Sequence, residues 1–246
     1  MKIKRTFKII SLSALMALAS AIGSAAADDT PAGISVNLGG SDTLEILLTL
    51  TIIALIPSIL IMMTSFTRII IVLSCLRNAL GLQQTPPNQV LIGIALFLSL
   101  FIMTPVLDKI NTDAYQPYKS KEITQEQAVD AAVKPLREFM LKNTNNDDLN
   151  MFLDLGGYGT PETFDEIKTT VIIPAFITSE LKRAFTIGFL LYLPFLIIDM
   201  VVSSTLMSLG MMMLPPSMIS LPFKLMLFVL VNGWDLIIKS LVISFN

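Results

Sequence analysis

The chain has 246 residues, 53% of them hydrophobic, and a formal net charge of −2. The apolar fraction exceeds the roughly 45–50% typical of soluble domains, and the near-neutral charge provides no basic surface for nucleic acid, so both of those classes are excluded. Histidine is absent and Cys75 is the single cysteine, which excludes metal sites built from His or Cys, His-based triads and Cys–His dyads; we expect no cofactor and no enzymatic activity.

The first 27 residues have the pattern of a secretory signal peptide. Four basic residues among the first eight precede an apolar run over 9–22, and small residues follow at Ala25-Ala26-Ala27. This order predicts cleavage after Ala27. An uncleaved first membrane helix is the alternative, but the apolar run is shorter than the ~20 residues that span a bilayer. Residues 28–43 would then form the mature N-terminal segment.

Residues 44–107 are predicted to form a first hydrophobic helical hairpin. Its first arm, 46–67, is uncharged and long enough to cross a bilayer, with Pro57 as an expected kink. We expect helix to continue from this arm to about Leu80. The second arm is the apolar run 90–107.

The turn of this hairpin is marked by helix-stopping residues and by positive charge. Gly81 and the pair Pro86-Pro87 end the first arm, and Arg68 and Arg77 precede the turn without an acidic residue. A cleaved signal peptide places the mature N-terminus outside. The turn is therefore predicted to face the cytoplasm, as the positive-inside rule prefers.

The stretch 108–183 is predicted to be a small helical extracytoplasmic domain. It holds most of the charged residues of the chain, and long loops are largely exempt from the positive-inside rule. Thr124 and Gln127 have the spacing of a capping box, and Thr160-Pro161-Glu162 has the cap, proline and acid of another helix start. Gly156-Gly157 separates these two helices. We expect the domain to be a packing scaffold.

Residues 184–246 are predicted to form a second hydrophobic hairpin, with arms at 184–207 and 221–245. Between the arms lies the sequence Gly-Met-Met-Met-Leu-Pro-Pro, residues 210–216, which we name the methionine loop. Glycine and Pro-Pro prevent a continuous helix, and methionine side chains are flexible, so the segment is predicted to be an adaptable apolar loop. A gate needs such a loop, but an apolar turn resting on lipid or core has the same sequence. The three methionines are Met211, Met212 and Met213.

The two hairpin turns resemble each other. Leu80-Gly81 is followed after four residues by Pro86-Pro87, and Leu209-Gly210 is followed after four residues by Pro215-Pro216. A parallel internal duplication, as some transporters have, is one explanation, and shared turn chemistry is the other. Both turns lie on the same predicted side of two hairpins that run in the same sense.

Four ionisable residues in or beside the second hairpin need partners, because charge at membrane depth is costly. They are Glu180, Asp199, Asp235 and Lys239. Asp235 and Lys239 are four residues apart and share a helix face, so we expect an ion pair. Glu180 and Asp199 are either proton or ion sites or structural groups, Asp199 then accepting a hydrogen bond from another subunit. We favour the structural interpretation, and with it a chain that belongs to an assembly.

Two long motifs resemble the FliP family of the flagellar type III export gate. The first begins Ser65-Phe-Thr-Arg-Ile-Ile-Ile-Val-Leu-Ser and continues Leu76-Arg-Asn-Ala-Leu-Gly-Leu-Gln-Gln-Thr-Pro-Pro-Asn-Gln-Val-Leu91. The second begins Leu193-Pro-Phe-Leu-Ile-Ile-Asp-Met-Val-Val202 and continues through Met211-Met-Met-Leu-Pro-Pro216 to Ser220-Leu-Pro-Phe-Lys224. The likeness covers nearly all of the chain after the signal peptide, and Leu82-Gln-Gln-Thr-Pro-Pro-Asn is similar to the flagellar rather than the virulence branch.

The resemblance implies an all-α protein with membrane-inserted helical hairpins, which forms an oligomeric export-gate ring. Such rings contain several copies together with FliQ and FliR, act beside FlhA and FlhB, and conduct unfolded flagellar subunits across the bacterial inner membrane at the flagellar basal body. In the family, part of the assembled ring lies toward the periplasm. The resemblance matches Met211, Met212 and Met213 to the family's methionine-rich constriction.

Two other classes of function stay open from the residues. An independent ion channel or secondary transporter would use Glu180 and Asp199 to couple ions, and would show flux when reconstituted alone. A purely structural membrane scaffold would show neither flux nor export.

Overall fold

The computed structural model describes residues 47–48, 50–51, 54–55, 58–59, 61–159, 163, 166–211 and 214–245. The chain forms two compact units, Met1–Leu50 and Thr51–Asn246, and nearly all described residues belong to the second. The predicted signal peptide with Ala27, the segment 28–43 and the expected kink at Pro57 lie outside the described residues.

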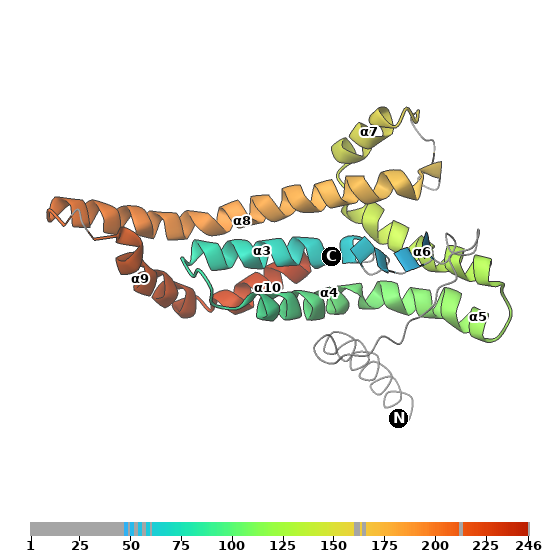
Figure 1. Ribbon diagram of the computed structural model, residues 1–246, viewed down its shortest axis with the longest axis horizontal. Helices are drawn as coiled ribbons and strands as arrows, with labels where there is room; N and C mark the ends of the chain where they lie inside the picture. The colour runs from blue at the N-terminus through green and yellow to red at the C-terminus, as the bar shows by residue number, and fades with distance from the viewer. Residues whose placement is uncertain are drawn as a thin grey trace, which may run out of the picture. The chain divides into compact units, whose positions relative to one another are not determined.

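The described elements of the second unit are helices, and no strand occurs among the described residues, so the all-α prediction is confirmed (Figure 1). In chain order they are α3 (Phe66–Ala79), α4 (Asn88–Ile110), the π-helix η1 (Asn111–Tyr115), α5 (Gln116–Lys119), α6 (Gln125–Asn143), α7 (Asn146–Leu155), α8 (Thr169–Ser208), α9 (Pro216–Leu230) and α10 (Gly233–Ile243).

Helix α3 begins later than the sequence predicted. A break at 63–65 interrupts the expected continuous helix, so that prediction was wrong. At the break the Thr64 hydroxyl donates to the backbone oxygen of Ile61 (2.8 Å), and the Ser65 hydroxyl donates to the Ser99 hydroxyl in α4 (3.1 Å). Hydroxyls that bond nearby groups compete with the helical hydrogen-bond ladder, and here they also attach the break to α4.

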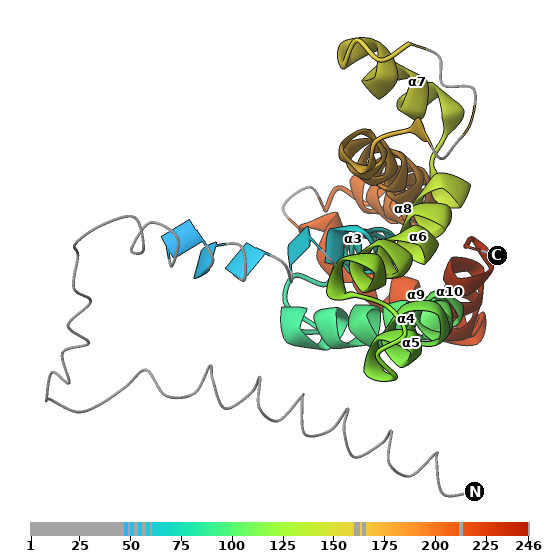
Figure 2. The same cartoon turned by 90° about the vertical axis from the view of Figure 1, so that its right-hand side faces the viewer.

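The core lies along α3, which is packed between α8 and α4 (Figure 2). Two contacts give the register of α3 and α8. Arg68 bonds Glu180, and an ideal Cβ at Gly188 would lie 2.8 Å from Sγ of Cys75. The sequence separation is nearly the same in both pairs, so α3 and α8 run parallel. The fully buried side chains at this interface include Ile69, Val72, Leu73, Leu76, Ile172 and Phe176.

Among the residues that the structure describes, two helices are long and apolar enough to cross a membrane, by length and composition: the continuous run Asn88–Lys119, which joins α4, η1 and α5, and the 40-residue α8. They contain the predicted arms 90–107 and 184–207. Helices α9 and α10 are each too short to pass this test alone and pass it only as a pair, which is bent by 64°. The predicted single arm 221–245 is therefore two helices.

The bend between α9 and α10 has a local cause. Asn232 adopts a left-handed conformation (φ 50°). The Phe228 ring lies against Gly233 and meets the Trp234 ring edge-on, with 5.5 Å between the ring centres. An ideal Cβ at Gly233 would lie 2.3 Å from that ring, so only glycine fits there.

The helices divide the charged stretch 108–183 differently from the prediction. The run through α4, η1 and α5 crosses the predicted boundary at 107/108, α8 crosses the one at 183/184, and the whole stretch belongs to the unit Thr51–Asn246. The capping box is confirmed: Thr124 N–H donates to Gln127 (3.0 Å) and Gln127 N–H donates to Thr124 (3.4 Å). The predicted helix start at 160–162 lies outside the described residues.

Candidate functional site

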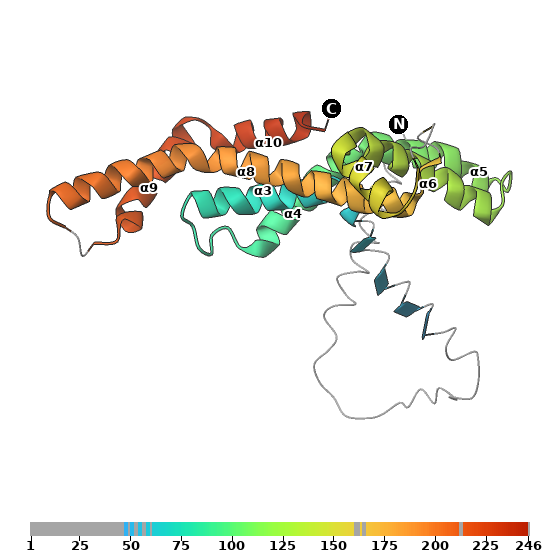
Figure 3. The ribbon, with the colours of Figure 1, turned by 90° about the horizontal axis from the view of Figure 1, so that it is seen from above.

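The methionine loop lies at the far end of α8, where a glycine ends the helix (Figure 3). Gly210 has a positive φ of 73°, its N–H donates to the Met207 oxygen (3.1 Å), and the Met211 N–H donates to the Leu206 oxygen (3.0 Å). This is the Schellman pattern of hydrogen bonds, which satisfies the last carbonyls of a helix. Met211 is exposed, whereas Met212 and Met213 lie outside the described residues.

The first turn ends its helix in the same way. Gly81 has a φ of 79°, its N–H donates to Asn78 (2.9 Å), and the Leu82 N–H donates to Arg77 (3.2 Å). The Arg77 guanidinium braces the turn further, because it donates to Asn88 (2.6 Å) and to the backbone oxygen of Pro86 (3.3 Å). The likeness of the two turns thus extends from sequence to backbone hydrogen bonds. Pro87 is the N-cap residue of α4.

The two turns nevertheless lie at different levels along the bundle. When the alignment of Arg68 with Glu180 is continued along the two parallel helices, Ala79, the last residue of α3, lies level with Leu191 of α8. Helix α8 continues from there to Ser208, a further distance of about 25 Å at 1.5 Å per residue. The methionine loop therefore projects well beyond the first turn (Figures 1 and 3).

Asp199 lies on this projecting part of α8 and is bound by two groups of α9. It accepts hydrogen bonds from the Ser220 hydroxyl (2.6 Å) and from the Lys224 ammonium (2.7 Å). Lys224 is buried and also donates to the backbone oxygen of Ala79 (3.1 Å), the last residue of α3. A lysine at a helix C-terminus satisfies a free carbonyl and complements the helix dipole. Lys224 thus joins α9, α8 and α3.

An apolar groove runs between the end of α8 and α9, next to the methionine loop. Its volume is about 510 Å³, and it is lined mainly by aliphatic side chains. The lining residues include Ile197, Val201, Leu209, Ile219 and Phe223.

Glu180 and Arg68 form a second, deeply buried set of charges. Both carboxylate oxygens of Glu180 bind Arg68, through Nε (2.8 Å) and through Nη2, and both side chains are essentially inaccessible to solvent. The remaining amino group of Arg68 donates to the backbone oxygen and the hydroxyl of Ser244, both at 2.9 Å. The guanidinium lies 3.7 Å from the Phe245 ring centre. Arg68 therefore lies inside α3 and joins it to α8 and to the end of α10, rather than lying at the first turn.

The hydrogen bonds of Glu180 and Asp199 indicate whether these residues are proton sites or structural groups. In the structure Glu180 is fully engaged by Arg68, and Asp199 is engaged within the same chain by Ser220 and Lys224. These contacts favour structural roles for both residues. Asp235 and Lys239 form the ion pair that their spacing predicted, at 2.7 Å on the surface of α10.

A third cluster attaches α7 to α8. The buried Asp148 carboxylate accepts hydrogen bonds from Lys182 and from the Ser179 hydroxyl (2.7 Å), and Ser179 accepts the backbone N–H of Asn145 (2.9 Å). Burial raises the pKa of Asp148, but the bonds from Lys182 and Ser179 outweigh burial and hold this pKa below its ordinary value.

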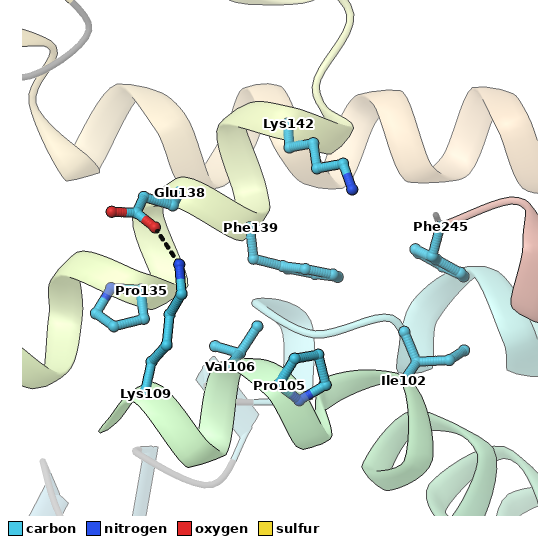
Figure 4. Close-up of a pocket in the computed structure, with 9 residues that line it drawn as sticks. All are labelled: Ile102, Pro105, Val106, Lys109, Pro135, Glu138, Phe139, Lys142 and Phe245. Carbon is cyan, nitrogen blue, oxygen red and sulfur yellow. Dashed lines mark hydrogen bonds and ion pairs between the residues drawn. The ribbon is translucent and has the colours of Figure 1, made fainter. Parts of the chain in front are cut away.

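A small cavity of about 210 Å³ lies between α4, α6 and the end of α10 (Figure 4). Its apolar walls include Phe139 and Phe245, whose rings stack at 6.2 Å. Lys109 and Glu138 form an exposed ion pair (3.0 Å) at its rim, and Lys142 extends over the rings. The ion pair joins α4 to α6.

Lys224, Ser220 and Asp148 help to hold the site together, and the sequence does not identify them as partners of other charges. The sequence does point to Arg68, but as a charge of the first turn rather than as the partner of Glu180. The rule that drew attention to Asp199, a charge inside an apolar segment, applies equally to Lys224.

Large apolar side chains remain exposed along the candidate membrane helices. Phe97 and Phe101 of α4 are 72% and 67% exposed, and Phe185 and Phe189 of α8 are 62% and 65% exposed. Surfaces of this kind are covered by lipid or by other protein chains.

Comparison with known proteins gives a consistent result. The family model described as the FliP family matches residues 49–241. A flagellar biosynthetic protein FliP of Bacillus subtilis (strain 168) is 55% identical over 205 residues, which cover 83% of this chain and 93% of that protein. The FliP proteins of Aquifex aeolicus (strain VF5), at 52% identity over 83% of this chain and 87% of that protein, and of Caulobacter vibrioides, at 49% over 96% and 90%, are similarly related.

Proposed function

The chain belongs to the FliP family of flagellar biosynthetic proteins, and from this premise we propose that it is a pore-forming component of the flagellar type III export gate. In this role it conducts unfolded flagellar subunits across the inner membrane during flagellum assembly. It serves as part of a conduit rather than as an enzyme.

The observation that carries the proposal is the position of the methionine loop at the projecting end of α8. Copies of the chain arranged around an axis bring their loops together, and Met211, Met212 and Met213 then form an apolar constriction. Narrow apolar constrictions close to ions by losing water. Methionine side chains are flexible enough to separate around a moving chain and to close again behind it.

The exposed apolar faces of α4 and α8 support assembly with other chains. We propose that these faces contact further copies of the chain, the partners FliQ and FliR, and lipid, with FlhA and FlhB acting alongside. A single chain in water would expose the apolar side chains of Phe97, Phe101, Phe185 and Phe189, and this supports the proposal that the chain functions in an assembly.

The same proposal includes processing and topology. A cleaved signal peptide, 1–27, leaves 28–43 as the mature N-terminal segment and places 108–183 outside the cytoplasm. Hairpins 44–107 and 184–246 enter the membrane, and part of the assembled ring lies toward the periplasm at the flagellar basal body.

The test of the gate replaces Met211, Met212 and Met213 with alanine. The assembled complexes should persist, but closed rings should leak ions and small solutes because the constriction loses apolar bulk. A matched control replaces three exposed methionines outside the loop, Met207, Met218 and Met226. Wild-type permeability in the loop variant, with assembly confirmed in the same sample, would remove the gating role from the loop.

A further inference from the structure

We propose that Lys224 is the positioning residue that holds the methionine loop in its closed place, by attaching the part of the chain that carries the loop to the end of α3. This inference rests on the gate function proposed above. We name the part that carries the loop the arm; it comprises residues 195–208 of α8, the methionine loop and α9.

The arm begins where α8 extends past the end of α3. The last residue of α3, Ala79, is level with Leu191 of α8. Pro194 follows within the helix. Because proline has no N–H, the helical hydrogen bond to the oxygen of Leu190 is missing, and helices bend most readily at such a position. The helix is therefore weakest at the point where the arm separates from α3.

The hydrogen bond from Lys224 to Ala79 joins the arm to α3 beyond that point. The donor is an ammonium on α9, and the acceptor is the backbone oxygen of Ala79 at 3.1 Å. The second bond of Lys224, to Asp199 at 2.7 Å, lies inside the arm and helps to orient the ammonium toward the Ala79 oxygen. Because Lys224 is buried, its bond to Ala79 competes little with water, whereas the Asp199 side chain is 42% exposed.

The apolar groove between α8 and α9 supports the same inference. Near the loop this groove of about 510 Å³ lies between the two helices and is lined by Ile197, Val201 and Phe223 among others. Loosely packed helices shift more easily than close-packed ones. A single polar contact at Lys224 therefore has a large influence on where the loop lies.

Three variants separate the bond to α3 from the pair inside the arm. Lys224→Met removes both bonds and keeps the apolar stem. Lys224→Arg keeps a cation that can donate to both acceptors. The exchange Asp199→Lys with Lys224→Asp restores an ion pair inside the arm, but its carboxylate cannot donate to the Ala79 oxygen.

We expect complexes with Lys224→Met and with the exchanged pair to leak about tenfold more than wild type, the effect of losing one charge-assisted hydrogen bond on a two-state balance. Lys224→Arg should seal nearly as wild type does. Lys239→Met, which removes the exposed pair with Asp235, is the matched control and should not leak. A tight seal in the exchanged pair would overturn the inference, because the bond to Ala79 would then be dispensable.

A distance measurement tests the inference independently of permeability. Spin labels at Met207→Cys in the arm and Asn78→Cys in α3, in a Cys75→Ser background and diluted with unlabelled chains, report the position of the arm. Lys224→Met should broaden this distance, whereas labels at Asn78→Cys and Thr186→Cys should be unchanged. If the loop-methionine variant leaks but Lys224→Met neither leaks nor broadens the distance, the inference fails and the gate function stands. If the loop-methionine variant does not leak, the gate function fails and the distance alone decides the inference.

Discussion

Gly188 is a position where α8 touches α3, and its replacement by alanine tests their parallel packing. An ideal Cβ there would lie 2.8 Å from Sγ and 3.0 Å from Cβ of Cys75. Real Cβ atoms are essentially never found at the shorter distance, so the helices must separate or Cys75 must move. Overpacking of this kind costs about 1–3 kcal/mol.

Part of this cost is offset in the measured stability, because alanine stabilises a helix relative to glycine by up to ~1 kcal/mol. Gly93 in α4 is the matched control, since an ideal Cβ at that position meets nothing within 4 Å. Gly93→Ala should therefore show only the gain in helix stability, without a clash. The difference between the two variants isolates the clash, at about 1–3 kcal/mol.

The assay is thermal unfolding of the purified chain in detergent, followed by helical circular dichroism. For a chain of this size the difference corresponds to midpoints about 2–12 °C apart. Cys75→Ala removes the sulfur and should recover most of the loss when combined with Gly188→Ala. Equal midpoints for Gly93→Ala and Gly188→Ala, or strictly additive effects of the Cys75 and Gly188 changes, would refute the close packing of Gly188 in α8 against Cys75 in α3.

Two further predictions concern α7 and processing. Because the pKa of Asp148 is lowered in the folded chain, its bonds to Ser179 and Lys182 contribute at neutral pH and are lost as the pH falls below about 4 through the folded-state pKa. The protection of α7 amides from hydrogen exchange, measured relative to the intrinsic exchange rate at each pH, should fall there, and Asp148→Asn should abolish that acid dependence; an unchanged profile in the variant would contradict the assignment. Intact-mass analysis of assembled protein should find Asp28 as the first residue, and retention of residues 1–27 would invert the proposed topology.

Local features of the fold followed from the sequence because they depend on residues only a few positions apart. The capping box of Thr124 and Gln127, the helix ends at Gly81 and Gly210, and the pair of Asp235 with Lys239 all lie within one or two helical turns. Glycine, proline and cap residues act on their own backbone, so their effect is the same in most tertiary settings.

The extent of the helices was harder to predict, because continuity depends on what surrounds a residue. The charges around Glu180 marked a boundary in the sequence, yet α8 passes through them, since Glu180 is satisfied by Arg68 and Lys182 binds Asp148. Conversely, the apolar segment 221–245 was predicted to be a single helix, but it bends at Asn232.

The composition and short-range motifs of this sequence determined an all-α membrane-type chain and the two hairpin turns. Only the tertiary structure decided which charges meet. Arg68 and Glu180 are 112 residues apart, and Lys224 and Ala79 are 145 apart. Pairings at such separations depend on the register of α3 against α8 and on the path of α9. That register is set by close contacts such as Cys75 with Gly188, which no periodicity in the sequence encodes.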